Sequence, residues 1–384
     1  MRKPDCLLVR VGELALKSKQ VQRRFFSILL NNIRAGLNEK KIKFNFEINP
    51  NRIFIYTKQI KKAIKILQKI FGITSISPVW TCYSNLNEMR ILATAIAKHI
   101  KLNKNQSFAI RARRAGKHEF SSQTIAEEAG GAVKRLTGVK VNLTAPEKEI
   151  FIECRSRKTY IFTEKVQGPG GLPLGTGGNV VCLFSGGIDS AVAAWLVAKR
   201  GCELVLLYAD IMPFTDKANL KRGKKVLKAL KPWHIGKKLK CYKFSHGKNL
   251  KEFVKCKNIT CILCKRQMYR IAEEIAKKEH ARAIVTGENL AQVASQTLTN
   301  LAVIDQAIST LVLRPLIGFD KEDIVNLAKE IGTYESSILP IMSCKAVPSK
   351  PATRANIKDV LSEEGKINIK KLTEQSLGSI KQLN

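Results

Sequence analysis

The residues best suited to chemistry lie in the hexapeptide SGGIDS, residues 185–190. It follows a run of apolar residues and precedes a segment whose apolar residues recur at helical spacing. A glycine turn between a strand and a helix directs backbone N–H groups and the positive end of the helix dipole at an anion. Gly186 and Gly187 let the backbone approach phosphate oxygens without an intervening Cβ atom. Ser185 and Ser190 add hydroxyl donors. The turn therefore predicts a phosphate site, although a glycine pair alone also serves close helix packing.

Two common phosphate-binding patterns, GxxxxGKS/T and GxGxxG, are absent from this turn. The hexapeptide instead resembles the SGGxDS signature of pyrophosphatase-loop enzymes, which cleave ATP between the α and β phosphates and leave AMP on a substrate oxygen. In that family the aspartate, Asp189 here, lies beside the pyrophosphate and its Mg²⁺. Adenylation makes a poor oxygen leaving group displaceable. The resemblance therefore implies ATP and Mg²⁺ as cofactors.

Cysteines form the second candidate group. Cys261 and Cys264 make a CxxC pair at the start of a predicted helix, with Cys256 before them and Cys344 far behind. Thiolates at this spacing suit zinc or an iron–sulfur cluster. The helix N-terminus and neighbouring basic residues such as Lys265 are expected to lower the thiol pKa values. A structural zinc knuckle completed by Cys256 is the alternative.

The charge balance predicts a polyanionic partner. The 384 residues include 67 Lys and Arg against 31 Asp and Glu, a net charge of +36, which exceeds what solubility requires. On the segment SFAIRARR, Arg111 and Arg113 share one strand face, Arg114 lies opposite, and Lys117 extends the patch. These residues are candidates for RNA phosphate contacts. A solvated strand edge, or a proteome rich in lysine, are the plainer explanations.

No apolar run is long enough to span a bilayer, and the amino-terminal apolar stretch is broken by Arg10 and Glu13. We therefore expect a cytoplasmic protein that does not bind membranes. In that compartment its ten cysteines are expected to be thiols or metal ligands, not disulfides.

The length predicts two or three domains. Residues 1–75 have the pattern of a ferredoxin-like unit, with a strand at 5–11, a helix at 19–39, strands at 42–48 and 52–57, and a helix at 61–71. Residues 76–167 predict a second small α/β domain, with helices near 86–100 and 121–136, a strand at 107–114 and a hairpin at 149–166. Residues 168–179 are a glycine-rich linker. In residues 180–384 apolar strands alternate with helices, including helices at 188–200, 262–279 and 292–302, which predicts a doubly wound parallel sheet.

Several separated strings together resemble tRNA 4-thiouridine synthetase over nearly the full length. They are RVGELALKS, FAIRARRAGKHEFSS, GPGGLPLGTGG, SGGIDS, TGENLAQVASQTLTNL and LRPLIGFDKEDIVNLAKEIGTYE. The resemblance implies a ferredoxin-like domain, a THUMP RNA-binding domain and a pyrophosphatase-loop catalytic domain. The implied reaction adenylates O4 of the uridine at tRNA position 8 and replaces it with sulfur, releasing AMP and pyrophosphate.

The resemblance also implies site residues and an assembly. The implied ATP contacts are Leu183, Phe184, Ser185, Gly186, Gly187, Asp189, Ser190, Tyr208, Ala209, Lys265, Gly287 and Gln296. Cys344 matches the family's essential sulfur-handling cysteine. A homodimer is the implied oligomer.

Many bacterial members of the family carry a rhodanese domain, and the stretch from Ala355 to Asn384 is too short for one. The CxxC pair resembles instead the archaeal-type branch, in which this pair and the later cysteine hold an iron–sulfur cluster. Cys261, Cys264 and Cys344 would then hold a cluster of the 4Fe–4S or 3Fe–4S type, with zinc as the alternative metal. Sulfur is expected from sulfide or from a donor of the cysteine-desulfurase type.

Two other classes of protein fit parts of the sequence. A small-molecule ATP pyrophosphatase that amidates or thiolates a metabolite would need the SGGIDS turn but has no use for residues 1–168. A non-catalytic RNA-binding protein would need the basic surface but not Asp189.

Overall fold

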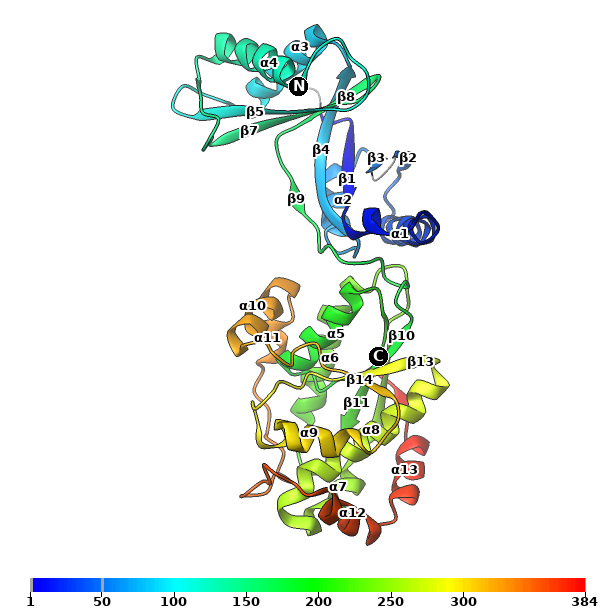
Figure 1. Cartoon of the computed structure of the whole chain (residues 1–384). Helices are drawn as coiled ribbons and strands as arrows, with labels where there is room; N and C mark the ends of the chain where they lie inside the picture. Colours follow the sequence, from blue (N-terminus) through cyan, green and yellow to red (C-terminus); the bar gives the residue numbers. More distant parts are fainter. Residues whose placement is uncertain (1–2, 50–51, 384) are drawn as a thin grey trace. The chain divides into compact units, whose positions relative to one another are not determined.

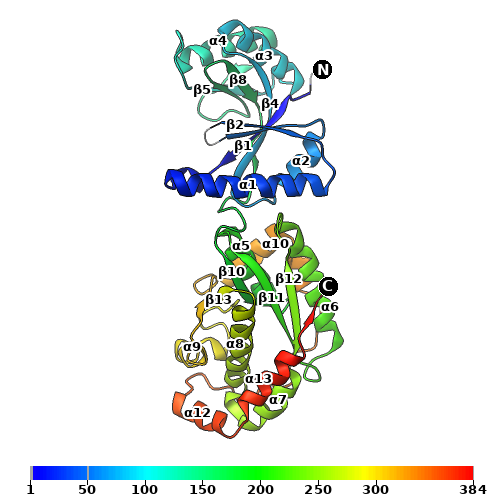
Figure 2. The same cartoon turned by 90° about the vertical axis from the view of Figure 1, so that its right-hand side faces the viewer.

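The computed structural model describes residues 3–49 and 52–383. The chain forms two compact units (Figures 1 and 2). The first contains the residues up to Gln22 and Ile33–Gly170, and the second contains Arg23–Asn32 and Gly171–Asn384. Within the described residues, no helix combines the length and apolar character that crossing a membrane requires.

One sheet runs through the whole first unit. Its strand order is β2-β3-β1-β4-β8-β7-β5-β6, and β9 pairs with β4. The strands are β1 (Cys6–Val11), β2 (Asn45–Asn49), β3 (Arg52–Tyr56), β4 (Ile73–Tyr83), β5 (Ser107–Arg114), β6 (Lys140–Val141), β7 (Lys148–Cys154), β8 (Lys158–Phe162) and β9 (Val166–Gln167).

Strand β4 joins the two parts of this sheet. Its first part pairs with β1, where Val9 lies opposite Ile76, and its last part pairs with β8, where Trp80 lies opposite Ile161. The predicted division between residues 75 and 76 falls inside this strand. The ferredoxin-like part and the following α/β part therefore share a continuous backbone ladder.

Helices of the first unit begin where the sequence places them. They are α1 (Lys19–Glu39), α2 (Ile60–Leu67), α3 (Leu86–His99) and α4 (Ser122–Thr137), with a short 3-10 helix η1 (Glu13–Leu16). The Ser121 side chain accepts a hydrogen bond from the Thr124 N–H and so caps α4. The helix ends at Gly138, whose φ of 67° suits the left-handed position after a helix.

The second unit contains the predicted doubly wound sheet, in the order β14-β13-β10-β11-β12-β15. Its strands are β10 (Asn179–Leu183), β11 (Glu203–Asp210), β12 (Lys240–Ser245), β13 (Ala281–Val285), β14 (Leu311–Leu313) and β15 (Lys381–Gln382). All neighbouring pairs are parallel except β12 with β15. From β10 the chain adds β11 and β12 on one side and then β13 on the other. The SGGIDS turn follows β10 at this switch point, where α/β proteins place ligands.

Helices cover both faces of this sheet (Figures 1 and 2). They are α5 (Ile188–Lys199), α6 (Lys217–Leu230), α7 (Gly247–Phe253), α8 (Thr260–Lys278), α9 (Leu298–Asp305), α10 (Lys321–Ile331), α11 (Tyr334–Ser337), α12 (Ile357–Gly365) and α13 (Ile369–Gly378), with 3-10 helices η2 (Lys231–Trp233), η3 (Val254–Ile259) and η4 (Ala294–Gln296). Helix α8 packs Ile271 and Ile275 against Val181 and Val205 of the sheet.

The predicted helix at 292–302 is wrong. The short helix η4 ends at Gln296, and Thr297 follows in an extended conformation. The Thr297 side chain then accepts a hydrogen bond from the Asn300 N–H and starts α9 at Leu298. A local N-cap therefore divides a stretch whose apolar spacing alone predicts one helix.

Candidate active site

The SGGIDS turn is locked by its own side chains and by α6. Ser190 Oγ accepts from the Ser185 N–H at 3.3 Å and donates to the Gly187 carbonyl at 3.1 Å. Gly186 has a φ of +71°, and a Cβ atom there would lie 2.6 Å from the Cα atom of Gly223. Glycine is therefore required at residue 186 both for its backbone conformation and for the approach of α6.

We expect Gly186→Ala to weaken Mg-ATP binding by about tenfold or more, or about 1.4 kcal/mol, because the added methyl group must displace the backbone of α6. Isothermal titration calorimetry measures the change. Gly178→Ala is the matched control, since Gly178 also has a positive φ, +78°, but no atom lies within 4 Å of its Cβ position. Equal ATP affinities for the two variants would contradict this account of the turn.

Asp189 lies where β13 and α10 approach the turn. A Cβ atom on Gly287, just after β13, would lie 2.7 Å from the carbonyl carbon of Asp189. Lys321, the first residue of α10, places its Nζ atom 2.5 Å from Asp189 Oδ1. Lys321 was not predicted as a site residue, although it lies in one of the strings that carry the family resemblance.

Arg222 of α6 is a second cation that the sequence analysis missed. An Nη atom of its guanidinium lies 4.0 Å from the Cβ position of Gly187. Its Nε atom is buried without a hydrogen-bond partner in the described part of the chain, and burial lowers the pKa of Arg222. Arg222 lies in a lysine-rich helix, so residue type alone does not single it out. A guanidinium beside a glycine turn suits phosphate oxygens.

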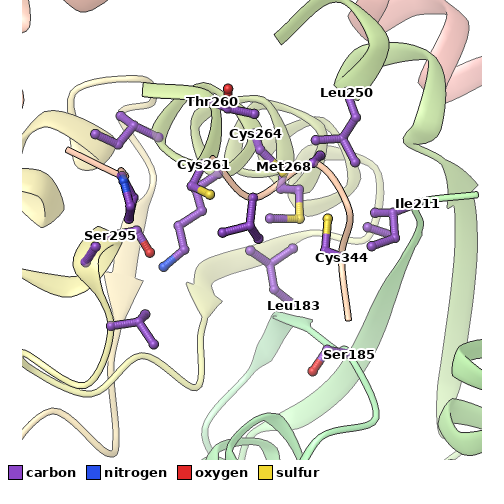
Figure 3. A pocket seen from close by; sticks show the side chains of 18 of the residues that line it. Leu183, Ser185, Ile211, Leu250, Thr260, Cys261, Cys264, Met268, Ser295 and Cys344 are labelled. Carbon is purple, nitrogen blue, oxygen red and sulfur yellow. The ribbon is translucent and has the colours of Figure 1, made fainter. Parts of the chain in front are cut away.

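A cavity of about 500 Å³ opens next to the turn (Figure 3). Six of the predicted nucleotide contacts line it, namely Leu183, Phe184, Ser185, Tyr208, Ala209 and Lys265. The other six predicted contacts do not line it: Gly186, Gly187, Asp189, Ser190, Gly287 and Gln296. Gln296 follows the lining residue Ser295, and its Oε1 atom is buried without a hydrogen-bond partner among the described residues.

All three predicted sulfur-handling cysteines line the same cavity. Figure 3 shows Cys261 and Cys264 on helix α8 and Cys344 on a separate coil segment. Hydrogen bonds hold that segment, because the Lys345 N–H donates to the Phe214 carbonyl at 2.8 Å and Thr215 Oγ1 donates to the Met342 carbonyl at 2.9 Å. Residues distant in sequence are thus brought to one cavity.

Cys256 is separate from these thiols. It lies in η3, is buried with Phe253 and Ile259, and does not line the cavity. Among residues 3–49 and 52–383, no three His, Cys, Asp or Glu side chains lie close enough to hold one metal ion. The zinc knuckle completed by Cys256 is therefore not formed.

The expected lowering of the thiol pKa values is wrong. Burial raises the pKa of Cys264 and of Cys261, and the neighbouring thiols raise both further. The nearby cations do not compensate. Arg266 turns to Glu364 of α12, with Nε 2.8 Å from Oε1, and the Lys265 Nζ atom lies 2.8 Å from Glu288 Oε1.

Glu288 organises a buried polar network beneath the cavity. Its carboxylate accepts hydrogen bonds from Lys265 at 2.8 Å, Tyr269 at 2.7 Å, Thr286 at 3.0 Å and Arg314 at 2.8 Å. Burial by itself raises the pKa of Glu288, but these donors and the two cations outweigh it and hold the pKa at about 2. The network fixes where the Lys265 side chain enters the cavity.

This depressed pKa makes Glu288 a source of acid sensitivity. Its stabilisation is present above the ordinary value of 4.5 and is lost as the pH falls toward about 2. We expect the free energy of unfolding of the second unit to fall over this range by roughly 3 kcal/mol more in the wild type than in Glu288→Gln. Urea unfolding followed by Trp195 and Trp233 fluorescence, with Trp80 replaced by Phe, measures it. Glu274→Gln, which changes a partly exposed carboxylate of α8 that pairs with Lys277, should parallel the wild type. A curve for Glu288→Gln that also parallels the wild type would contradict the assignment.

The first unit has a cavity of its own, of about 700 Å³, which we call the cationic cavity. Five cationic residues line it, Arg10, Arg52, Arg111, Arg113 and Lys165, against two acidic residues, Glu149 and Glu153. Two of the four predicted RNA contacts, Arg111 and Arg113, are therefore on its wall. Arg114 and Lys117 are not among its lining residues.

Aromatic rings form part of the cationic cavity. Phe151 and Phe162 stack with centroids 5.0 Å apart, and Lys165 Nζ lies 3.6 Å from the Phe151 centroid. Arg10 covers Phe162 at 4.6 Å and pairs with buried Glu153 at 3.0 Å. Cations held over rings suit a ligand that carries both phosphates and bases. Arg10 of β1 and Lys165, between β8 and β9, were not predicted as contacts because both lie far in sequence from SFAIRARR.

Three family models match the chain. They are described as ThiI ferredoxin-like domain over residues 6–77, THUMP domain over residues 83–164, and Thiamine biosynthesis protein (ThiI) over residues 175–369. A relative from Methanosarcina mazei named "Probable tRNA sulfurtransferase" is 39% identical, and the match covers 100% of this chain and 96% of the relative. A relative of the same name from Methanothermobacter thermautotrophicus is 40% identical, and the match covers 95% of this chain and 94% of the relative.

A solved structure also matches over almost the whole chain. It is described as a 4-thiouridine synthetase–RNA complex with bound ATP, and it is 32% identical with a TM-score of 0.88. The match covers 99% of this chain and 99% of that chain. The order of the parts and the fold are therefore shared with a protein that was crystallised with both RNA and ATP.

Proposed function

The chain belongs to the tRNA sulfurtransferase family and is an ATP-dependent tRNA-thiolating enzyme, and we propose that its target is O4 of the uridine at tRNA position 8, which it converts to 4-thiouridine. The observation that carries this proposal is the cavity of the second unit. Six predicted nucleotide contacts and three thiols line this one cavity. An activated base could there be reached by sulfur.

In the first step O4 attacks the α-phosphorus of ATP, the bond to the β-phosphate bridging oxygen breaks, and pyrophosphate leaves. The N–H groups of the turn and the Arg222 guanidinium stabilise the charge on the leaving group. Asp189 supplies a carboxylate for Mg²⁺, which binds one or two carboxylates together with phosphates. Gln296 does not line the cavity, and its role as a nucleotide contact stays a prediction.

In the second step hydrosulfide attacks C4 and the C4–O4 bond breaks, so that O4 departs on AMP. The hydrosulfide proton passes to the phosphate products. Lys265 is positioned by Glu288 at 2.8 Å and holds the AMP phosphate as it leaves. Sulfide or a donor of the cysteine-desulfurase type provides the sulfur.

We assign an iron–sulfur cluster to Cys261, Cys264 and Cys344. The three sulfurs share one cavity but do not form a group that could hold one metal ion. A cluster fits this arrangement better than zinc, because its thiolates bind different iron atoms. When bound, a 4Fe–4S cluster with three protein ligands supplies an iron atom that is open to hydrosulfide. The raised thiol pKa values mean that loading must release protons.

We propose that the cationic cavity, with Arg114 and Lys117 beyond it, binds tRNA phosphates. For Arg113→Ala we expect weaker binding of all tRNAs and a slope of log affinity against log salt that is smaller by about 1. Filter binding over a salt series measures both. Lys140→Ala, an exposed cation in β6 outside the cavity, is the control. A slope for Arg113→Ala equal to that of Lys140→Ala would contradict the assignment.

Incubation of the protein with tRNA, Mg-ATP and sulfide without oxygen tests the proposed function. Nucleoside chromatography should show 4-thiouridine, with equal AMP, and a tRNA carrying cytidine at position 8 should give neither. AMP formation without tRNA would instead favour a small-molecule pyrophosphatase. ATP cleavage with tRNA but no 4-thiouridine would overturn the proposal. The homodimer and the cytoplasmic location stay predictions, and light scattering of the purified chain tests the first.

A further inference from the structure

His246 directly follows β12 and is completely buried. Its Nε2 atom lies 3.2 Å from the Sγ atom of Cys264. The ring packs edge-on to Phe244, with centroids 5.6 Å apart, and against Phe253 at 6.4 Å. The imidazole is thus enclosed by rings except where it meets the cavity thiol and one polar neighbour.

That polar neighbour determines the tautomer of the imidazole. Asn249 of α7 donates one Nδ2 hydrogen to His246 Nδ1 at 2.9 Å and the other to Ser376 Oγ of α13 at 2.9 Å. Because Nδ1 accepts a hydrogen bond, the proton of a neutral ring lies on Nε2. His246 is therefore the donor in its contact with Cys264.

We propose that His246 is a positioning residue for the sulfur site, whose Nε2–H donates a hydrogen bond to the Cys264 thiolate and orients it toward the cavity. The proposal rests on the proposed role of Cys264 as a ligand of the cluster. A donor on a thiolate sulfur withdraws electron density from it and raises the reduction potential of the attached centre.

A packing role alone does not account for this arrangement. Burying an imidazole among phenyl rings costs free energy unless both nitrogens are bonded, and a phenylalanine would fill the same space. The polar chain instead runs from Ser376 through Asn249 and His246 and ends on a sulfur that lines the cavity. Three separate elements, α13, α7 and the end of β12, are used to present one N–H group to one thiol.

Redox titration of the anaerobically reconstituted full chain tests the proposal. His246→Phe should lower the reduction potential of the cluster. At the wild-type midpoint potential the ratio of oxidised to reduced cluster should then rise about tenfold, which corresponds to a shift of about 59 mV for a one-electron couple. His246→Gln keeps an N–H donor and should recover most of that shift. His234→Phe is the matched control, because His234 is also buried in the second unit but its Nε2 atom accepts from the Leu204 N–H. An unchanged midpoint in His246→Phe would overturn the proposal.

A second measurement needs no cluster. In the metal-free wild type labelled with ¹⁵N-histidine, long-range ¹H–¹⁵N correlation should show His246 as the Nε2–H tautomer, and Asn249→Leu should add the Nδ1–H tautomer. A wild type in the Nδ1–H form would overturn the proposal. If the wild type takes up no cluster, the proposed sulfur route fails, and the tautomer measurement alone decides the role of His246.

Discussion

Replacing Cys344 with serine is expected to abolish 4-thiouridine formation while ATP is still cleaved to AMP on tRNA. The serine hydroxyl is a hard, weakly acidic donor that does not replace a thiolate as a ligand of iron or as a carrier of sulfur. Cys344 lines the cavity on a coil segment apart from the SGGIDS turn, so nucleotide contacts are retained. We expect thiolation to fall by at least about 10²-fold.

The assay separates the two steps by counting AMP and 4-thiouridine in the same reaction. Cys256→Ser is the matched control, since Cys256 lies just before α8 but is buried outside the cavity. It should retain both products. Equal losses of thiolation in the two variants would contradict the division between cavity thiols and core thiol, and a normal yield from Cys344→Ser would exclude this residue from sulfur transfer.

Asp189→Asn is expected to lower the rate of AMP formation by about 10²–10³-fold and to leave tRNA affinity unchanged. The substitution keeps the shape of the side chain but removes the negative charge that faces Lys321 at 2.5 Å and that would bind Mg²⁺. An amide is a much weaker ligand for this cation than a carboxylate. The proposed tRNA contacts lie in the first unit and do not involve Asp189.

Rapid-quench measurement of AMP and filter binding of tRNA together test this expectation. Asp320→Asn is the control, because it also removes one negative charge, at the residue before Lys321. Asp320 is exposed and is the N-cap residue of α10, but its side chain makes no capping hydrogen bond. This variant should behave as the wild type. A protein whose function is RNA binding alone would be unaffected by either change. An unchanged rate of ATP cleavage in Asp189→Asn would contradict the assignment of the SGGIDS turn as the ATP site.

The local features of this fold are predictable from sequence because short-range physics determines them. Helix α1 and strand β5 have the predicted bounds, since each carries a clear apolar period between polar breaks. The SGGIDS turn is recognisable because its residue types are dictated by the ligand and by the backbone. The three cavity thiols are suggested by spacing and by family resemblance.

Features that depend on distant contacts are not predictable in this way. The raised thiol pKa of Cys264 follows from its burial, and the pairing of Arg266 with Glu364 of α12 removes a charge expected to act on the thiols. Neither fact is visible in the CILCKR string. The contacts of Arg10 with Glu153 and of His246 with Cys264 likewise depend on other elements, because each side chain is ordinary within its own segment.

The continuous pairing along β4 fixes the distance between two sets of cations in the first unit. Arg10 and Arg52 stand on strands to one side of β4, and Arg111 and Arg113 on a strand to the other. Hydrogen bonds of a single strand set the separation of these two sets of cations, so it cannot be adjusted by a hinge between them. A nucleic acid that contacts both sets must have phosphates at that separation. One with a different phosphate spacing cannot contact both sets, whatever its base sequence.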